Sequence, residues 1–491
     1  MNELRNQAES SLPTSHGRWA RVLLWGLVLL PFFLQAAYFP SYGHLQSDDY
    51  HGVIERLSDG ERLSRDPGTW FTIRIVQHRV TVPSVFWGLN LLFFDGSNQP
   101  MALLSLIILV AIFLIVLAQL RESVAYPSAE FWPLAAVASI LVFAPINGTN
   151  LAISFQGIHF FLCNLFAVLS ILVLVRGWRY RLIWLALLGL LGLLTFSSAM
   201  AYWPVLVVGA VLLRRGKGEV AALAALGLAA LLVWTRGRMP GTGAYSVSPD
   251  PELILRYLAT FFGATFTRDP TIARFVGWIG MTAAVVALAV ALWRRRLGSP
   301  EAFWVMLQGY AFSSALMAAL GRSAQNGEVQ AMSPRYGHYP ALFWLGLLVF
   351  IGLLIKPQDA ASRLANWRPA MLLSQWIAVG LISVYTFQVG INTIRYLASR
   401  GARQVVTDLA FRLSAQDEQL VRETVSHKPK SVIAKIPVFR DLQHTPFDRP
   451  APPLDWPEIP PELVQAAPHP EIVGEIKEIV TTEHPTWTRV R

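Results

Sequence analysis

The chain contains 491 residues, of which 54% are hydrophobic and only 15% are charged. Such an apolar composition over this length excludes a soluble protein with one core and indicates a polytopic membrane protein. The net charge of +10 would suggest a nucleic-acid partner in a soluble domain, but in a membrane protein its meaning depends on the side on which the arginines lie.

We expect about eleven transmembrane helices, because a span needs roughly 20 predominantly apolar residues. The first stretch, residues 19–39, is longer than the apolar part of a signal peptide and is expected to remain as an uncleaved span. Several later stretches are short, and the pair that flanks residues 195–198 fits either two helices or one broken helix. The stretches lie near residues 19–39, 101–120, 131–145, 158–175, 182–194, 203–213, 220–234, 272–293, 303–320, 342–355 and 371–393.

One further apolar stretch, residues 80–94, contains Pro83 and is too short to span comfortably, so it predicts a helix in the membrane interface. Without a span here, the later basic clusters fall on the same side as the N-terminus, as the positive-inside rule requires. We therefore expect a cytoplasmic N-terminus and extracytoplasmic interfacial helices within residues 52–94, and the positive charge needs no nucleic-acid partner. The clusters are Arg176/Arg179/Arg181, Arg214/Arg215/Lys217, Arg294/Arg295/Arg296 and Lys356/Arg363/Arg368.

This topology places three polar segments on the outer face, at residues 39–98, 235–271 and 321–340. The cytoplasmic turns contain neither a D-x-D motif nor a glycine-rich phosphate loop, so any chemistry is expected outside. Beyond residue 393 the composition changes, because residues 404–425 predict an amphipathic helix and prolines crowd between 446 and 470. We divide the chain into a transmembrane domain, residues 1–393, and a small extracytoplasmic module, residues 394–491.

Two adjacent carboxylates, Asp48 and Asp49, lie in the first outer loop, residues 39–98. An aspartate in the hydrocarbon core costs about 2.5–3.5 kcal/mol, so the pair is expected at the aqueous rim or in a wet cavity. There an ionised carboxylate can take a proton from a sugar hydroxyl. Neighbouring helical residues point about 100° apart, so one aspartate would be the base and the other supportive, with Tyr50 beside them. The alternative is that both only cap a helix that begins near His51.

The best candidate for a phosphate contact is Arg335, in the sequence Ser333-Pro334-Arg335-Tyr336-Gly337-His338 directly before a predicted span. A planar guanidinium can make the bidentate contacts that a phosphate needs. Tyr336 and His338 are candidate substrate contacts beside it. The alternative is an interfacial arginine that meets lipid headgroups.

A third candidate group is Gln77-His78-Arg79, on the outer interfacial segment. His78 is suited to hydrogen-bond a substrate, and Arg79 to pair with a phosphate or with Asp49. The alternative for both is snorkelling of their polar ends toward the membrane interface. No motif in the sequence requires a cofactor. A divalent metal is still possible, because Asp48, Asp49 and His78 could together bind Mg²⁺ or Mn²⁺.

These residues together resemble the GT-C class of glycosyltransferases, which use polyprenyl-phosphate-linked sugars. The resemblance covers roughly residues 19–355 and rests on the acidic pair after the first span, the interfacial helices and the arginine before a late span. A series of short motifs also resembles uncharacterised bacterial multi-spanning proteins that we associate with this class. These motifs are Gln77-His78-Arg79, Asp95-Gly96-Ser97, Phe196-Ser197-Ser198 and Ser333-Pro334-Arg335-Tyr336.

The resemblance implies a GT-C-like fold in a bacterial inner membrane and an inverting transfer to a glycan, lipid or protein acceptor of the cell envelope. It places the base at Asp49 or Asp48 and the donor phosphate at Arg335, with Arg79 as a second contact. The chain lacks the Asp-Glu pair of protein O-mannosyltransferases and the Trp-Trp-Asp-Tyr signature of oligosaccharyltransferases, which leaves the acceptor open.

Three other classes remain as alternatives. A transporter or lipid flippase would carry ionisable residues within its spans, whereas the polar residues there are mainly Asn164, Gln308, Gln375 and Gln388. An O-antigen polymerase or ligase would use a diphosphate-linked glycan instead of a monophosphate donor. A purely structural membrane protein is the third alternative.

Overall fold

The computed structural model describes residues 16–37, 74–75, 78–94, 97–124, 128–236, 250–355, 368–412 and 418–424, with short pieces at 430, 433–434, 436–437, 479–481 and 488–490. Within these ranges the chain is helical, as expected, apart from two pairs of very short antiparallel strands. β1 (Arg74–Ile75) pairs with β2 (His78–Arg79), and β3 (Ile479–Thr481) pairs with β4 (Thr488–Val490). Composition and periodicity did not predict either pair.

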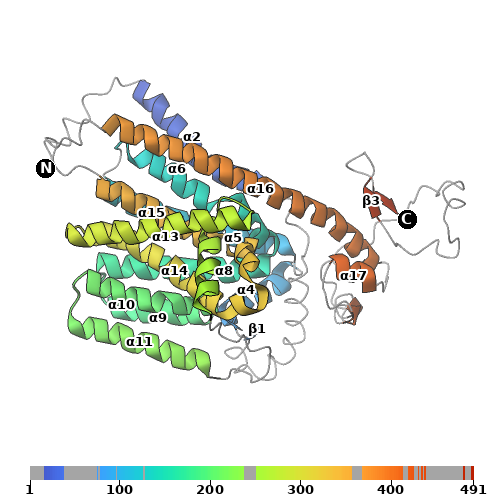
Figure 1. The fold of residues 1–491 in the computed structure, drawn as a ribbon. Helices are drawn as coiled ribbons and strands as arrows, with labels where there is room; N and C mark the ends of the chain where they lie inside the picture. Colours follow the sequence, from blue (N-terminus) through green and yellow to red (C-terminus); the bar gives the residue numbers. More distant parts are fainter. Residues whose placement is uncertain are drawn as a thin grey trace, which may run out of the picture.

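A helix is present at each of the eleven stretches predicted as spans (Figure 1). Within the described residues, nine segments are long and apolar enough to cross a membrane, so the chain is a multi-pass membrane protein. The helices at two further stretches, α9 (Arg181–Leu193) and α10 (Tyr202–Leu212), are apolar but shorter. The others are α2 (His16–Ala37), α5 (Asn98–Val124), α8 (Ser154–Arg176), α11 (Lys217–Thr235), α13 (Pro270–Trp293), α14 (Ser299–Asn326), α15 (His338–Ile355) and α16 (Arg368–Arg412). The ninth segment, Phe131–Ala152, begins with α6 (Phe131–Val142) and continues through two short elements.

Short helices gather at one end of this bundle. α4 (Thr81–Phe94) has 14 residues and is therefore only about 21 Å long, too short to cross a hydrocarbon core of about 30 Å. α12 (Pro251–Gly263) is equally short and packs along α13, with Asp250 capping its N-terminus. The remaining short elements are η3 (Pro145–Asn147), α7 (Gly148–Ala152), η4 (Ser197–Ala201), η5 (Glu328–Met332) and η6 (Pro334–Tyr336).

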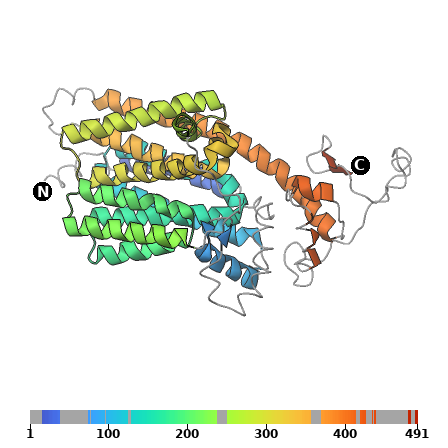
Figure 2. The ribbon, with the colours of Figure 1, turned by 60° about the horizontal axis from the view of Figure 1, so that its bottom comes forward.

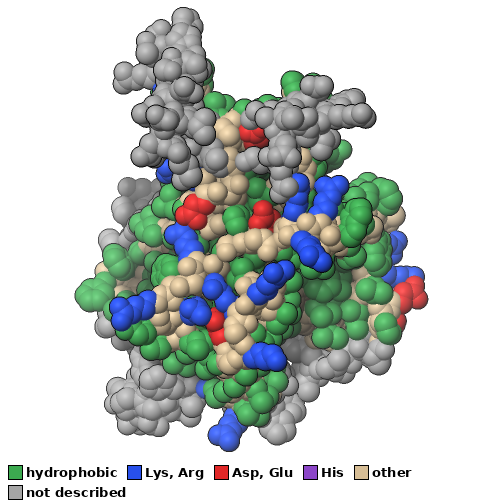
Figure 3. Space-filling view, turned by 90° about the vertical axis from the view of Figure 1, so that its left-hand side faces the viewer, with side chains coloured by type: hydrophobic (Ala, Val, Ile, Leu, Met, Phe, Trp, Pro, Cys, Tyr) green, Lys and Arg blue, Asp and Glu red, His purple; other side chains and the backbone are tan. Residues whose placement is uncertain are grey.

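The opposite end of the bundle carries the basic clusters. Figure 3 shows this end, with Lys and Arg side chains spread over it and far fewer acidic ones. Arg215 donates to the carbonyl of Leu174 at 2.6 Å, and Arg296 donates to that of Leu354 at 3.0 Å. The first bond joins the ends of α10 and α8, and the second joins the ends of α13 and α15. Three of the four predicted clusters therefore lie at this end. The side chains of the fourth cluster, Lys356/Arg363/Arg368, lie outside the described residues.

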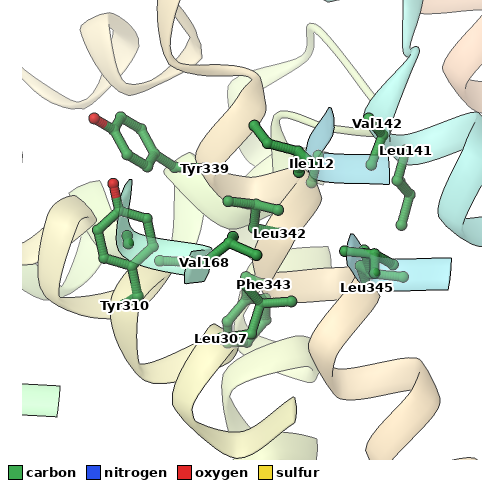
Figure 4. Packing of buried hydrophobic residues seen from close by; sticks show 14 of the residues in the cluster. Ile112, Leu141, Val142, Val168, Leu307, Tyr310, Tyr339, Leu342, Phe343 and Leu345 are labelled. Carbon is green, nitrogen blue, oxygen red and sulfur yellow. The ribbon is translucent and has the colours of Figure 1, made fainter. Parts of the chain in front are cut away.

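The core lies where α5, α6, α8, α14 and α15 meet. Figure 4 shows Ile112, Leu141, Val168, Leu307 and Leu345 packed together there, with Tyr310 and Tyr339 at one side of the cluster. Large aromatic side chains are completely enclosed, which fixes the helices against one another because interiors pack as densely as organic crystals. Fully buried examples are Trp87, Phe131, Phe161, Tyr202, Tyr257, Phe261, Phe262, Phe303 and Trp304.

α16 is much longer than a membrane span. Its 45 residues extend about 67 Å, and its second half leaves the bundle and leads to α17 (Glu418–Thr424) (Figures 1 and 2). Helix was expected both at 371–393 and at 404–425, and α16 and α17 occupy these stretches. Residue 393, where the sequence suggested a domain boundary, lies inside α16, so one continuous helix joins the two predicted domains.

Candidate functional site

Segments far apart in the sequence meet at the end of the bundle opposite the basic clusters. The imidazole of His78 stacks on the ring of Phe196 with centroids 4.1 Å apart, and its Nδ1 lies 2.6 Å from Oγ of Ser197. The ring of Phe160 contacts both Phe196 and His338, with each centroid separation 4.9 Å. The start of α8 therefore joins β2, η4 and the start of α15 into one aromatic wall.

This wall unites residues from three of the four motifs that the sequence singled out, namely those around His78, Phe196 and Arg335. Helix packing brings them together although more than 100 residues separate each from the next. Ser97, from the fourth motif, accepts a hydrogen bond through its carbonyl from Nδ2 of Asn90 at 3.0 Å, close to the end of α4. Gln77, Asp95 and Gly96 lie outside the described residues.

Behind the wall, a chain of buried hydrogen bonds runs into the bundle. The hydroxyl of Tyr339 donates to Oγ of Ser198 at 2.6 Å, and Sγ of Cys163 lies 3.2 Å from the same oxygen. The hydroxyl of Tyr310 donates to Oδ1 of Asn164, the residue after Cys163, at 2.9 Å and also lies 3.8 Å from Sγ of Cys163. Buried polar groups are costly unless they are paired, so these bonds fix Phe196-Ser197-Ser198 against α8, α14 and α15. Sequence reasoning identified neither tyrosine, because aromatic residues in apolar runs look like ordinary core.

Two arginines, Arg322 and Arg335, lie close to two other tyrosines, Tyr257 and Tyr336. The guanidinium of Arg322 lies 5.9 Å from the ring centroid of Tyr336. Burial is the main reason that the pKa of Tyr257 is raised, while both arginines act in the opposite direction by favouring the phenolate. The phenolic oxygen of Tyr257 is buried and has no hydrogen-bond partner among the described residues. The sequence placed Arg322 on this face but gave it no role.

Electrostatics also keep His78 neutral. Burial, aided by the positive charge of Arg322, lowers the pKa of His78 to about 3. The neutral ring can share a single proton with Ser197, in either direction according to its tautomer. His78 is therefore suited to hydrogen-bond a substrate and unsuited to carry charge at neutral pH.

Arg335 is half-buried on η6, where hydrogen bonds hold both its backbone carbonyl and its side chain. Asn150 donates to the carbonyl of Arg335 at 3.2 Å, and Nε of Arg335 donates to Oγ of Ser333 at 3.1 Å. Among the described residues no carboxylate pairs with this guanidinium. The described carboxylates at this end have other partners. Glu328 pairs with Arg274, and Glu252 pairs with Arg256. Asp250 and Asp269 cap the N-termini of α12 and α13.

A third cation, Arg268, is partly enclosed between α12 and α13. It donates through Nη1 to the carbonyl of Met332, and its Nη2 is buried with no partner in the part of the chain that the structure describes. Burial lowers the pKa of Arg268 to about 10, so it remains charged at neutral pH. Arg268, Arg322 and Arg335 thus lie at this end of the bundle, the last two close to tyrosine side chains.

The other predicted site residues lie in different surroundings. Nη2 of Arg79 donates to the carbonyls of Val233 at 3.1 Å and Arg236 at 3.4 Å, so it binds the C-terminal end of α11. Tyr336 and His338 are both buried and form the wall beside Arg335 instead of an open surface. Asp48, Asp49 and Tyr50 lie outside the described residues.

The described part of the chain contains no group of three or more His, Cys, Asp or Glu side chains that could hold a metal ion. The predicted metal ligands other than His78 are the two aspartates outside this part.

No protein-family model, no curated protein and no solved structure matches this chain. A function must therefore be argued from the site itself and from the motifs that meet in it.

Proposed function

We propose that the protein is an inverting glycosyltransferase of the GT-C type, which transfers a sugar from a polyprenyl-phosphate donor to a glycan, lipid or protein acceptor of the cell envelope. The observation that carries this proposal is Arg335, a half-buried guanidinium with no described carboxylate partner, beside Arg322 and the aromatic wall. An anionic group attached to a lipid and a sugar fits this combination of charge, aromatic surface and membrane edge.

The proposed reaction is a single displacement. The acceptor hydroxyl oxygen forms a bond to the anomeric carbon while the bond from that carbon to the phosphate oxygen breaks. Asp49 or Asp48 takes the hydroxyl proton, and the lipid phosphate departs as an anion. Such a leaving group needs charge stabilisation more than protonation, which Arg335 supplies through its planar fork. A divalent metal at the aspartates remains compatible with this scheme.

The proposed orientation puts the basic end in the cytoplasm and the site outside, across a bacterial inner membrane. The arginine-rich connections at one end of the bundle support it, because positive residues are retained on the cytoplasmic side. The C-terminal module then also lies outside, since α16 leaves the bundle at the end that carries the site.

The experiment compares Arg335→Lys and Asp49→Asn with wild type, using polyprenyl-monophosphate and polyprenyl-diphosphate sugars as donors. Loss of the fork in Arg335→Lys should weaken donor binding by roughly 10- to 100-fold. Asp49→Asn, or Asp48→Asn if that residue is the base, should lower turnover by about 10² to 10⁴ with donor binding nearly unchanged.

Arg256→Lys is the matched control, because Arg256 lies on α12 at the same end but is exposed and paired with Glu252. It should leave both quantities unchanged. Transfer that occurs only from the diphosphate donor would point to a polymerase or ligase instead. Normal binding and transfer in Arg335→Lys and in both aspartate variants would refute the proposal.

A further inference from the structure

An apolar groove opens on the side of the bundle, toward its basic end. α10 and α13 form its walls, and α14 with α15 forms its floor. Its volume is about 420 Å³, within the range of roughly 300–1,000 Å³ that is usual for ligand sites. Val208 on one wall and Val285 on the other are 56% and 68% exposed, so the groove is open sideways.

The length and position of the groove match one leaflet of a bilayer. Along α13 it extends from Met281 to Leu292, about 16 Å, whereas the whole hydrocarbon core is about 30 Å thick. It begins at the basic end of the bundle and ends near the middle, at Phe312 and Phe343. A hydrocarbon chain that enters from the leaflet at the basic end would fill it.

Arginine residues follow the helix ends on both sides of the groove's basic end. Leu212 and Leu292 line its basic end, and the chain continues directly into Arg214 on one side and into Arg294 and Arg295 on the other. All three arginines are exposed, and among the described residues none forms a salt bridge.

These three arginines differ from their neighbours in what they contact. A cation at a helix C-terminus is favourable in itself, and this accounts for Arg215 and Arg296, which donate to the carbonyls of Leu174 and Leu354. The three exposed arginines make no such contact with a carbonyl among the described residues. Arg214 and Arg295 moreover adopt φ of 53°, the left-handed conformation that ordinarily favours glycine at a helix end. Both helix ends thus carry an exposed charge where a glycine would fit with less strain.

We propose that this groove and its arginines form a binding site for an anionic phospholipid. One acyl chain lies between α10 and α13, and the phosphate group meets Arg214, Arg294 and Arg295. Basic pockets between transmembrane helices are a known physical basis for selecting anionic headgroups. The site is independent of the proposed glycosyl transfer, because the candidate donor contacts lie at the opposite end of the bundle.

The test measures lipid retention by native mass spectrometry on the full-length chain in detergent. The probes are dioleoylphosphatidylglycerol, which is anionic, and dioleoylphosphatidylcholine, which is not. Wild type should retain one phosphatidylglycerol with clear preference. In Arg214→Asn/Arg294→Gln/Arg295→Asn the affinity should fall roughly 100-fold, since each basic residue near a headgroup contributes about fivefold. Asparagine is used at the two left-handed positions because it tolerates that conformation.

Two matched controls separate the groove from general surface effects. Val285→Trp should fill the groove and reduce retention, whereas Val286→Trp changes an equally lipid-exposed neighbour that does not line it and should have no effect. Arg179→Gln, in another basic connection, should also have none. Equal retention of both lipids, equal loss in Val285→Trp and Val286→Trp, or displacement of phosphatidylglycerol by a polyprenyl phosphate would overturn the proposal.

Discussion

The close approach of α12 and α13 gives the sharpest prediction about the framework of the site. A Cβ atom added at Gly277 of α13 would lie 1.7 Å from the carbonyl oxygen of Ala259 in α12, and one at Gly263 would lie 1.8 Å from that of Ala273. Backbone atoms cannot rotate away as a side chain can. Because ordinary Cβ contacts begin at 3.4 Å, Gly277→Ala must push the two helices apart.

Overpacking of this kind costs about 1–3 kcal/mol, so Gly277→Ala should lower the melting temperature in detergent by several degrees. It should also weaken donor binding, because α12 carries Phe261, whose ring centroid lies 5.7 Å from that of Tyr336 beside Arg335.

Gly380→Ala in α16 is the control, since nothing lies within 4 Å of the added Cβ. Its melting temperature should stay equal or rise slightly, because alanine favours helix over glycine. If Gly277→Ala were as stable as Gly380→Ala, the two helices would not pack as closely as described.

Three further predictions concern charge, hydrogen bonding and topology. Because the folded pKa of His78 lies near 3 and the unfolded value near 6.5, the unfolded chain binds an extra proton between these values. Stability should then fall as pH drops below 6.5, by at most about 1.4 kcal/mol per pH unit, and melting curves of His78→Gln should lose this part of the dependence. Tyr339→Phe removes the donor to Ser198 and should cost about 1–2 kcal/mol in the same assay; an unchanged melting temperature would mean that this bond is dispensable. Reporter fusions at Gly60 and Gly216 should report opposite sides of the membrane, and the same side for both would refute the proposed topology.

Much of the framework could be predicted from the sequence because it follows from local patterns. Apolar runs locate the eleven helices predicted as spans, since a backbone in lipid must satisfy its own hydrogen bonds, whereas α12 lies in the segment 235–271 that was predicted only as a polar outer loop. The basic clusters at 176–181, 214–217 and 294–296 are predicted to share one side, and the structure brings them to one end. The motifs around His78, Phe196 and Arg335 were grouped by resemblance, and helix packing places them in contact.

The parts that could not be predicted depend on packing between helices. Tyr310 and Asn164 lie on α14 and α8, and no periodicity in either helix reveals that their side chains meet at 2.9 Å. The contacts of Arg79 with the carbonyls at the end of α11 also depend on helix packing, while its predicted contact with a phosphate stays a prediction. The length of α16 beyond the bundle also escaped prediction, since only its first half has the composition of a span.

The arginines of this protein differ in what their guanidinium groups bind, and Arg335 differs from those that bind carbonyls or carboxylates. Arg79, Arg215 and Arg296 bind carbonyls at helix ends, while Arg181 and Arg274 bind carboxylates. The carbonyls accept hydrogen bonds from the guanidinium N–H groups, and the carboxylates also neutralise the positive charge. Arg335 makes neither through its guanidinium among the described residues: its only bond there is Nε to Ser333, which leaves the two amino groups of the fork available. A half-buried guanidinium is costly without an anion, and the geometry of the fork matches the two oxygens of either a carboxylate or a phosphate.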